Sequence, residues 1–160
     1  MKSDTLIVYN LCGLLKNNTK QWITNIEDLL KDDDDFDFCI SACNVNEETK
    51  KYCKEYFKHR KVKLHFVDDI LPVNVTFNFA CLINPGYKYY IYCASDVKRN
   101  SQEKIVSKIK KFHIENNNAI TGAYVLNDAL PQAQLHYKDK LKIGQDVTFK
   151  PGEAFNCHFV

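Results

Sequence analysis

Arginine and glycine are scarce in this chain of 160 residues, and their scarcity excludes several classes of function. Only Arg60 and Arg99 are arginines among 22 basic residues, and the formal net charge is +2. Bidentate recognition of phosphates and bases relies on arginine, and a net charge of +2 is too small to attract a polyanion. We therefore expect no nucleic-acid partner. The five glycines form no dinucleotide-binding turn, no P-loop and no hydrolase elbow of the Gly-x-Ser-x-Gly type.

The chain also lacks a Cys-x-x-Cys pair, a signal-peptide core at its start, and any apolar run of membrane-spanning length. Its seven cysteines are odd in number and several fall in apolar runs, which predicts buried thiols in a reducing compartment. Cys39 and Cys43 are four residues apart on an expected strand, and one buried face explains this spacing better than a zinc site. We therefore expect a cytoplasmic protein without a membrane span.

Apolar runs of strand length alternate with amphipathic segments along most of the sequence. Because such continuous runs are typical of strands covered on both faces, we expect an α/β fold with a mainly parallel sheet and helices on both faces. The pattern leaves the strand order open. The expected strands are 5–12, 36–43, 62–67, 87–93 and 119–126, with a weak edge strand or hairpin at 141–149 and a terminal strand at 155–160.

The helices between these strands are expected from their capping residues and apolar spacing. Thr19 caps the first, Asn44 or Asn46 begins the second, and Asn100 or Ser101 caps the last. Pro72 disfavours a helix, so residues 71–76 are expected to form an irregular link before a short helix at 77–83. Lysines 108, 110 and 111 are expected on a solvated helix face.

A single acid, Asp96, follows the aromatic strand 87–93 after the small residues Ala94 and Ser95. Open α/β sheets bind ligands outside the carboxyl ends of their strands, and packing gives no reason for an acid there. Without a glycine-rich cradle, the charge of a bound diphosphate requires a divalent cation, and a carboxylate suits Mg²⁺ or Mn²⁺. The alternative is that Asp96 is only a turn acid.

Amides and other polar residues follow the remaining strands. Asn44 and Asn78 can read a base or ribose through paired donors and acceptors. The alternatives are that Asn44 only caps a helix and that Asn78 only binds neighbouring loop backbone.

The run from Val75 to Asp96 resembles the core of family-2-type glycosyltransferases with the GT-A fold, the fold of nucleotide-diphospho-sugar transferases. In that family a short helix beginning near an asparagine leads into an aromatic strand and an Asp-x-Asp-like metal motif. Asn78 is similar to the helix asparagine, and Ala94-Ser95-Asp96 is similar to the motif. Val8-Tyr9-Asn10 resembles the end of the family's first strand, so the resemblance spans roughly residues 5–126.

The resemblance implies a nucleotide-binding edge, a cation site and a catalytic base. Asp96 would hold Mn²⁺ or Mg²⁺. His158 is a second candidate ligand, and the alternative is that it has only a structural role. Asp128 is the candidate base. Two residues depart from the family pattern: Ala94 replaces the first acid of the metal motif, and Asn44 replaces an acid of the second strand. The residues expected at the nucleotide are Tyr9, Asn10, Cys12, Asn44, Thr76, Asn78 and Ser95.

The expected function is transfer of a sugar from a nucleotide-diphosphate donor to the hydroxyl of a glycan or other acceptor. We expect one GT-A-like domain, with a nucleotide-sugar-binding core at 5–126 and a short acceptor-side segment at 127–160. Any further domains would belong to a longer chain. The alternative is a non-catalytic nucleotide-sugar-binding or assembly domain of a larger protein. A receiver-like signalling domain is disfavoured because Tyr9-Asn10 supplies no acid after the first strand.

Overall fold

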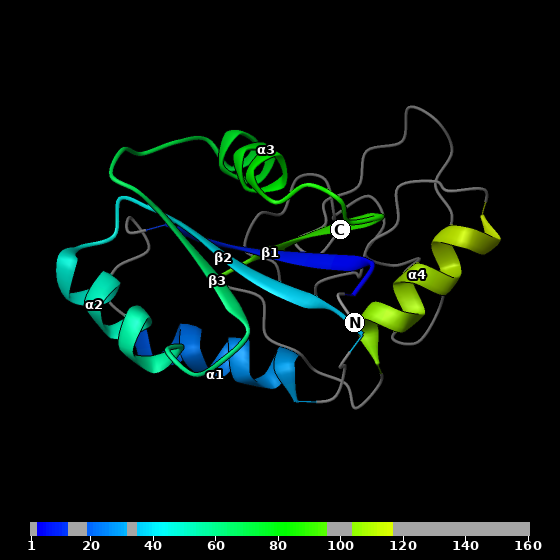
Figure 1. The fold of residues 1–160 in the computed structure, drawn as a ribbon, viewed down its shortest axis with the longest axis horizontal. Coiled ribbons are helices and arrows are strands. Elements are labelled where there is room, and N and C mark those ends of the chain that lie inside the picture. Colours follow the sequence, from blue (N-terminus) through cyan, green and yellow to red (C-terminus); the bar gives the residue numbers. More distant parts are fainter. Residues whose placement is uncertain (1–2, 13–18, 32–34, 96–103, 117–160) are drawn as a thin grey trace, which may run out of the picture.

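Four strands and four helices alternate along the chain in the computed structural model, which describes residues 3–12, 19–31, 35–95 and 104–116 (Figure 1). The segments 119–126, 141–149 and 155–160, where further strands are expected, lie outside the described residues. The elements are β1 (Thr5–Cys12), α1 (Thr19–Leu30), β2 (Asp37–Cys43), α2 (Glu47–Tyr56), β3 (Val62–Val67), α3 (Val73–Ile83), β4 (Tyr89–Ala94) and α4 (Ile105–Glu115).

The described strands form one sheet in the order β3-β2-β1-β4, and every neighbouring pair is parallel. This confirms the expected parallel sheet. The chain moves from β1 outward to β2 and β3, and then crosses to the other side of β1 to form β4. The strand order therefore reverses between β1 and β4, which we call the switch point.

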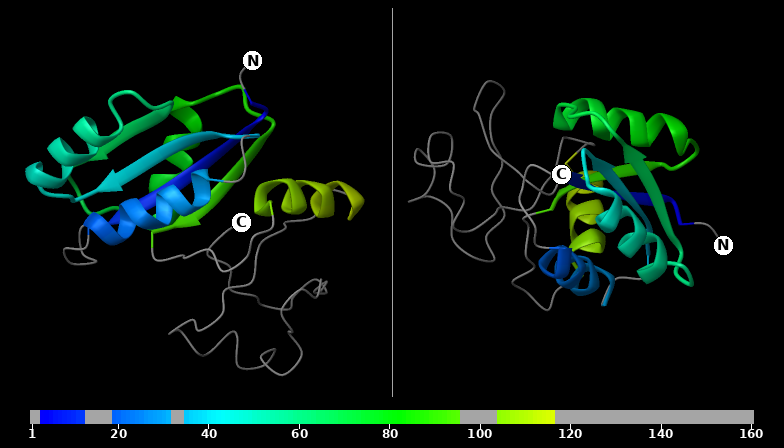
Figure 2. Two further views of the ribbon diagram at one scale, coloured as in Figure 1. Left: turned by 90° about the horizontal axis from the view of Figure 1, so that it is seen from below. Right: turned by 90° about the vertical axis from the view of Figure 1, so that its left-hand side faces the viewer.

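Helices cover both faces of the sheet, as expected (Figure 2). Side chains alternate between the faces along β1: Ile7, Tyr9 and Leu11 join the larger core under α1, α2 and α4, whereas Leu6 and Val8 pack against α3. Ala80 of α3 is fully buried against the sheet. Both faces of β1 and β2 are thus apolar, which explains their uninterrupted hydrophobic runs.

Helix α3 begins at Val73, so the expectation of an irregular link through residue 76 is wrong. Pro72 occupies the position just before the first helical residue, where its missing N–H is not required. Its carbonyl oxygen accepts the N–H groups of Val75 and Thr76 and thereby closes the first turn. The proline starts this helix rather than preventing it.

The caps of the other helices are partly those expected. Asn46 and not Asn44 caps α2, because its Oδ1 accepts the N–H of Thr49 at 2.8 Å. Helix α1 already includes Thr19 as its first residue. Helix α4 has Lys104 at its cap position, and the expected caps at residues 100 and 101 lie outside the described residues.

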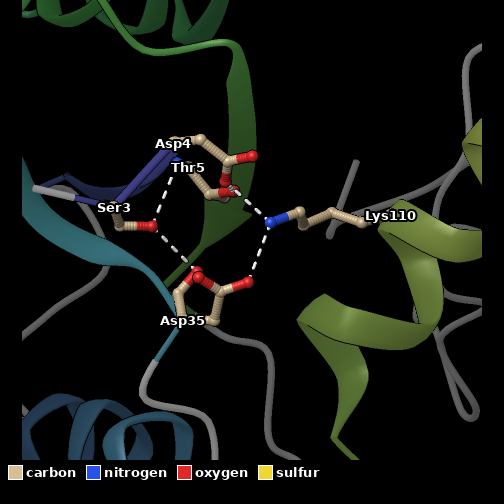
Figure 3. A network of polar contacts seen from close by, with 5 residues as sticks. All are labelled: Ser3, Asp4, Thr5, Asp35 and Lys110. Atoms are coloured by element: carbon tan, nitrogen blue, oxygen red, sulfur yellow. Dashed lines mark hydrogen bonds and ion pairs between the residues drawn. The ribbon is translucent and has the colours of Figure 1, made fainter.

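Lys110 attaches α4 to the amino ends of the first two strands (Figure 3). Its Nζ donates to Asp4 Oδ1 at 2.7 Å and to Asp35 Oδ2 at 2.9 Å. Ser3 reinforces this cluster, because its hydroxyl donates to the carbonyl oxygen of Asp35 and accepts the N–H of Thr5. The Lys110 side chain is only 14% exposed, so the expectation that it lies on a solvated face is wrong. Lys108 and Lys111 of the same run are exposed.

Cys39, Cys43, Cys53 and Cys93 are buried thiols, as expected, and Cys81 is a partly buried thiol. Burial raises the pKa of the Cys39 thiol to about 12 and that of Cys81 to about 11, so both sulfurs are protonated at neutral pH. In the part of the chain that the structure describes, no helix combines the length and the apolarity needed to cross a membrane.

Candidate functional site at the switch point

The carboxyl ends of β1 and β4 lie side by side, with Asn10 opposite Ala94 and Tyr9 opposite Cys93. Chain connections at a reversal of strand order leave in opposite directions, and open α/β sheets bind ligands outside the strand ends at such a point. The topology alone therefore selects this edge of the sheet as the candidate site. The cluster around Lys110 lies at the opposite, amino edge.

Asn10 is the most informative side chain at the switch point. It is 5% exposed, and its Oδ1 is the one buried side-chain oxygen or nitrogen within the described residues that has no hydrogen-bond partner. Leaving such an acceptor unsatisfied costs about 1–3 kcal/mol, so a buried unpaired group in a folded protein requires an explanation. A bound donor from a ligand or an ordered water supplies one.

Ser41 and Thr76 form a buried polar boundary next to Asn10. Ser41 is the register partner of Asn10 on β2, and its Oγ donates to the Thr76 carbonyl oxygen at 3.4 Å. The Thr76 hydroxyl donates in turn to the Pro72 carbonyl oxygen at 2.9 Å. These bonds hold the first turns of α3 against the carboxyl end of β2. Ser41 was not expected at the site, because in sequence it is one small residue inside a buried strand.

Two buried side chains converge on the carbonyl oxygen of Ser95, the residue after β4. The Tyr9 hydroxyl donates to it at 2.8 Å, and Asn25 Nδ2 donates to it at 3.1 Å. Asn25 lies on α1 and was also missed. A signal for it exists, because an asparagine three residues after Trp22 and four before Leu29 falls inside the apolar stripe of that helix.

The remaining expected nucleotide-binding residues occupy different surroundings. Cys12 ends β1, opposite Cys43. Asn44 is exposed at a left-handed φ of 48°, which asparagine tolerates well, and its N–H donates to the Val67 carbonyl oxygen. Asn78 is exposed on α3, two residues beyond the sheet-facing Thr76.

The structure thus joins Tyr9 to Ser95, places Asn10 opposite Ala94, and leaves Asn78 exposed on α3. Contacts of any of these residues with a nucleotide stay predictions. Asp96, Asp128 and His158 lie outside the described residues.

A cation site cannot be built from the described residues by themselves. Among residues 3–12, 19–31, 35–95 and 104–116, no group of three or more His, Cys, Asp or Glu side chains is arranged to hold a metal ion. The protonated, buried Cys39 thiol is a poor ligand. Ala94 is 8% exposed at the end of β4 and offers no side-chain donor. The unpaired Asn10 Oδ1 does fit the oxygen preference of Mg²⁺ and Mn²⁺, but a carboxylate must come from elsewhere in the chain.

Comparison with known proteins places the fold. No protein-family model matches the chain, and no curated protein matches it either. A structurally similar protein is the mannosyltransferase PcManGT from Pyrobaculum calidifontis, solved in complex with GDP-Man and Mn²⁺, with a TM-score of 0.57 and 8% sequence identity. The match covers 71% of this chain and 33% of the mannosyltransferase chain, so this chain spans about a third of that enzyme's length. The all-parallel α/β sheet flanked by helices is therefore a glycosyltransferase-like fold, consistent with GT-A.

Proposed function

We propose that this chain binds a nucleoside-diphosphate sugar and a divalent cation at the switch point, as the donor-binding part of a glycosyltransferase. The observation that carries the proposal is the buried, unpaired Asn10 Oδ1 beside Ala94, at the reversal of strand order. The likeness in fold to a mannosyltransferase solved with GDP-Man and Mn²⁺ supports the same ligand class. We propose residues 5–126 as the donor-binding core and 127–160 as the acceptor side.

Each side chain has a distinct part in this proposal. Asn10 accepts a hydrogen bond from an N–H or O–H group of the nucleotide through its Oδ1. Asp96 holds the cation, with His158 as a further candidate, and Asp128 removes the proton of the acceptor hydroxyl. A bound Mn²⁺ or Mg²⁺ neutralises the charge of the departing diphosphate.

Thermal-shift measurements with GDP and UDP, each with and without Mn²⁺, test the proposal. We expect a rise in melting temperature that needs nucleotide and Mn²⁺ together, because a ligand that binds only the folded state stabilises it. Asp96→Ala should abolish the dependence on Mn²⁺. The matched control is Glu55→Ala, which removes an exposed acid of α2. The absence of any Mn²⁺-dependent shift in the parent chain would refute the proposal.

A second function is favoured by Ala94, which stands at the end of β4 where the resemblance predicts the first metal-binding acid. A cation site with one acid fewer suits a non-catalytic nucleotide-sugar-binding or assembly domain of a larger protein. Release of free sugar from GDP-mannose and UDP-glucose in the presence of Mn²⁺ separates the two functions. Nucleotide binding without sugar release or transfer would favour the non-catalytic domain.

A further inference from the structure

We propose that Asn25 and Tyr9 are positioning residues that hold the carboxyl end of β4, next to Asp96 in the sequence, and that cation-dependent binding of the nucleotide depends on them. The inference rests on the proposed function for the role of Asp96, whereas the anchoring itself does not. The two donors come from α1 and β1, 70 and 86 residues away from Ser95 in sequence, and meet at one carbonyl oxygen.

The two hydrogen bonds fix the orientation of the Ser95 carbonyl group. A carbonyl oxygen has two lone pairs, and the Tyr9 hydroxyl and the Asn25 amide engage both on Ser95. Because the peptide group is planar, fixing the direction of the Ser95 carbonyl also fixes the plane of its peptide group. The orientation of the peptide group that follows β4 is thus set by two side chains from other elements of the fold.

The hydrogen bonds from Tyr9 and Asn25 hold the chain at the point where the hydrogen-bond ladder between β1 and β4 ends. The β1–β4 pairing ends at Asn10 and Ala94, so Ser95 has no register partner on β1. Ser95, Asn25 and Tyr9 are nevertheless buried, with exposed fractions of 3%, 2% and 0%. A buried amide in the apolar stripe of α1 is unfavourable unless it is hydrogen-bonded. An apolar residue at position 25 would preserve the stripe, and the bond to the Ser95 carbonyl offsets part of the cost of burying an amide there.

The first test needs no ligand. We expect Tyr9→Phe and Asn25→Leu to accelerate amide hydrogen exchange in the peptide that covers the end of β4, because the anchored carbonyl loses one of its two donors. Tyr90→Phe is the matched control, since it also removes a tyrosine hydroxyl that donates to a backbone carbonyl, that of Asn84. Unchanged exchange at the end of β4 in both test variants would overturn the anchoring, whatever the protein binds.

The second test measures GDP binding by calorimetry in the presence and absence of Mn²⁺. Each single variant should weaken Mn²⁺-dependent binding about fivefold, the worth of one hydrogen bond. The double variant should weaken it more than the product of the two singles, because only then is the buried carbonyl left without a donor. The Mn²⁺-independent component and the Tyr90→Phe control should stay within twofold of the parent.

These outcomes separate the two proposals. If the parent shows no Mn²⁺-dependent binding, the proposed function fails while hydrogen exchange still decides the anchoring. If the parent binds but both variants bind as tightly as Tyr90→Phe, the positioning role is refuted and the proposed function stands. An equal loss of Mn²⁺-dependent and Mn²⁺-independent binding would show general destabilisation and would also refute the positioning role.

Discussion

Replacing Lys110 by methionine should lower the free energy of unfolding by about 1–3 kcal/mol. Methionine keeps the apolar stem of the side chain but removes the ammonium group. That group bonds Asp4 and Asp35, whose side chains are 46% and 58% exposed, so each pair is worth about 0.2–1 kcal/mol rather than the value of a buried bridge. The ammonium also lies 5.4 Å from the centre of the Tyr89 ring, which adds about 0.5–1 kcal/mol.

The dependence of this effect on pH follows from the two pKa shifts. The bond from Lys110 is the main cause that lowers the pKa of Asp4 below 3.8, so this stabilisation is complete above that value and is lost as the pH falls through the lower folded pKa. Burial alone lowers the pKa of Lys110, but the bonds to Asp4 and Asp35 outweigh it and raise the pKa above 10.5. The stabilisation is therefore complete below 10.5 and is lost as the pH rises through the higher folded pKa.

Urea unfolding followed by the fluorescence of Trp22, the single tryptophan, measures the effect. Lys111→Met is the matched control on the same helix, since Lys111 makes one exposed pair with Glu115 at 3.8 Å, worth about 0.3–0.5 kcal/mol. The difference between the variants should be constant from about pH 5 to 9 and should shrink in about 1 M NaCl. The reasoning is wrong if Lys110→Met costs no more than Lys111→Met, or if its cost is the same at pH 2.5 and pH 7.

Three further predictions concern single side chains. Asn10→Leu removes an unpaired buried acceptor, so it should leave the free energy of unfolding unchanged or raise it by up to about 1 kcal/mol. The same substitution should weaken GDP binding. A fall of more than about 1 kcal/mol in the free energy of urea unfolding would show that Oδ1 is satisfied in solution. Asn46→Ala should cost about 1 kcal/mol in the same assay through loss of the α2 cap, and no change would exclude that cap. Burial raises the pKa of the Cys39 thiol to about 12, so Cys39 should resist iodoacetamide at pH 8 until urea unfolds the chain. Alkylation of the folded protein, detected by mass spectrometry, would contradict the burial of Cys39.

Strand positions could be read from the sequence because each strand here carries its own signal. The runs at 5–12 and 62–67 give β1 and β3 with the bounds that the structure has, and β2 differs by one residue. Branched and aromatic side chains favour extended backbone locally, and burial of both sheet faces makes the runs continuous. The resemblance to glycosyltransferases likewise pointed to the end of β4 before any strand order was known.

Helix starts were less predictable, because they depend on which residue takes the cap. Pro72 disfavours a helix interior but is well tolerated beside a first turn, and the sequence does not distinguish these positions. Asn44 and Asn46 are equally suited to begin α2, and only the left-handed turn at Asn44 leaves the cap to Asn46.

The sequence by itself determined the kind of structure: alternating strands and helices, a parallel sheet, and polar residues following the strands. Only the tertiary structure decided which strand ends are neighbours, because a strand buried on both faces carries no pattern that names its partners. The order β3-β2-β1-β4 sets Asn10 beside Ala94 and leaves its Oδ1 without a partner. The contact of Asn25 with Ser95 spans 70 residues of sequence and exists only once α1 lies against the sheet.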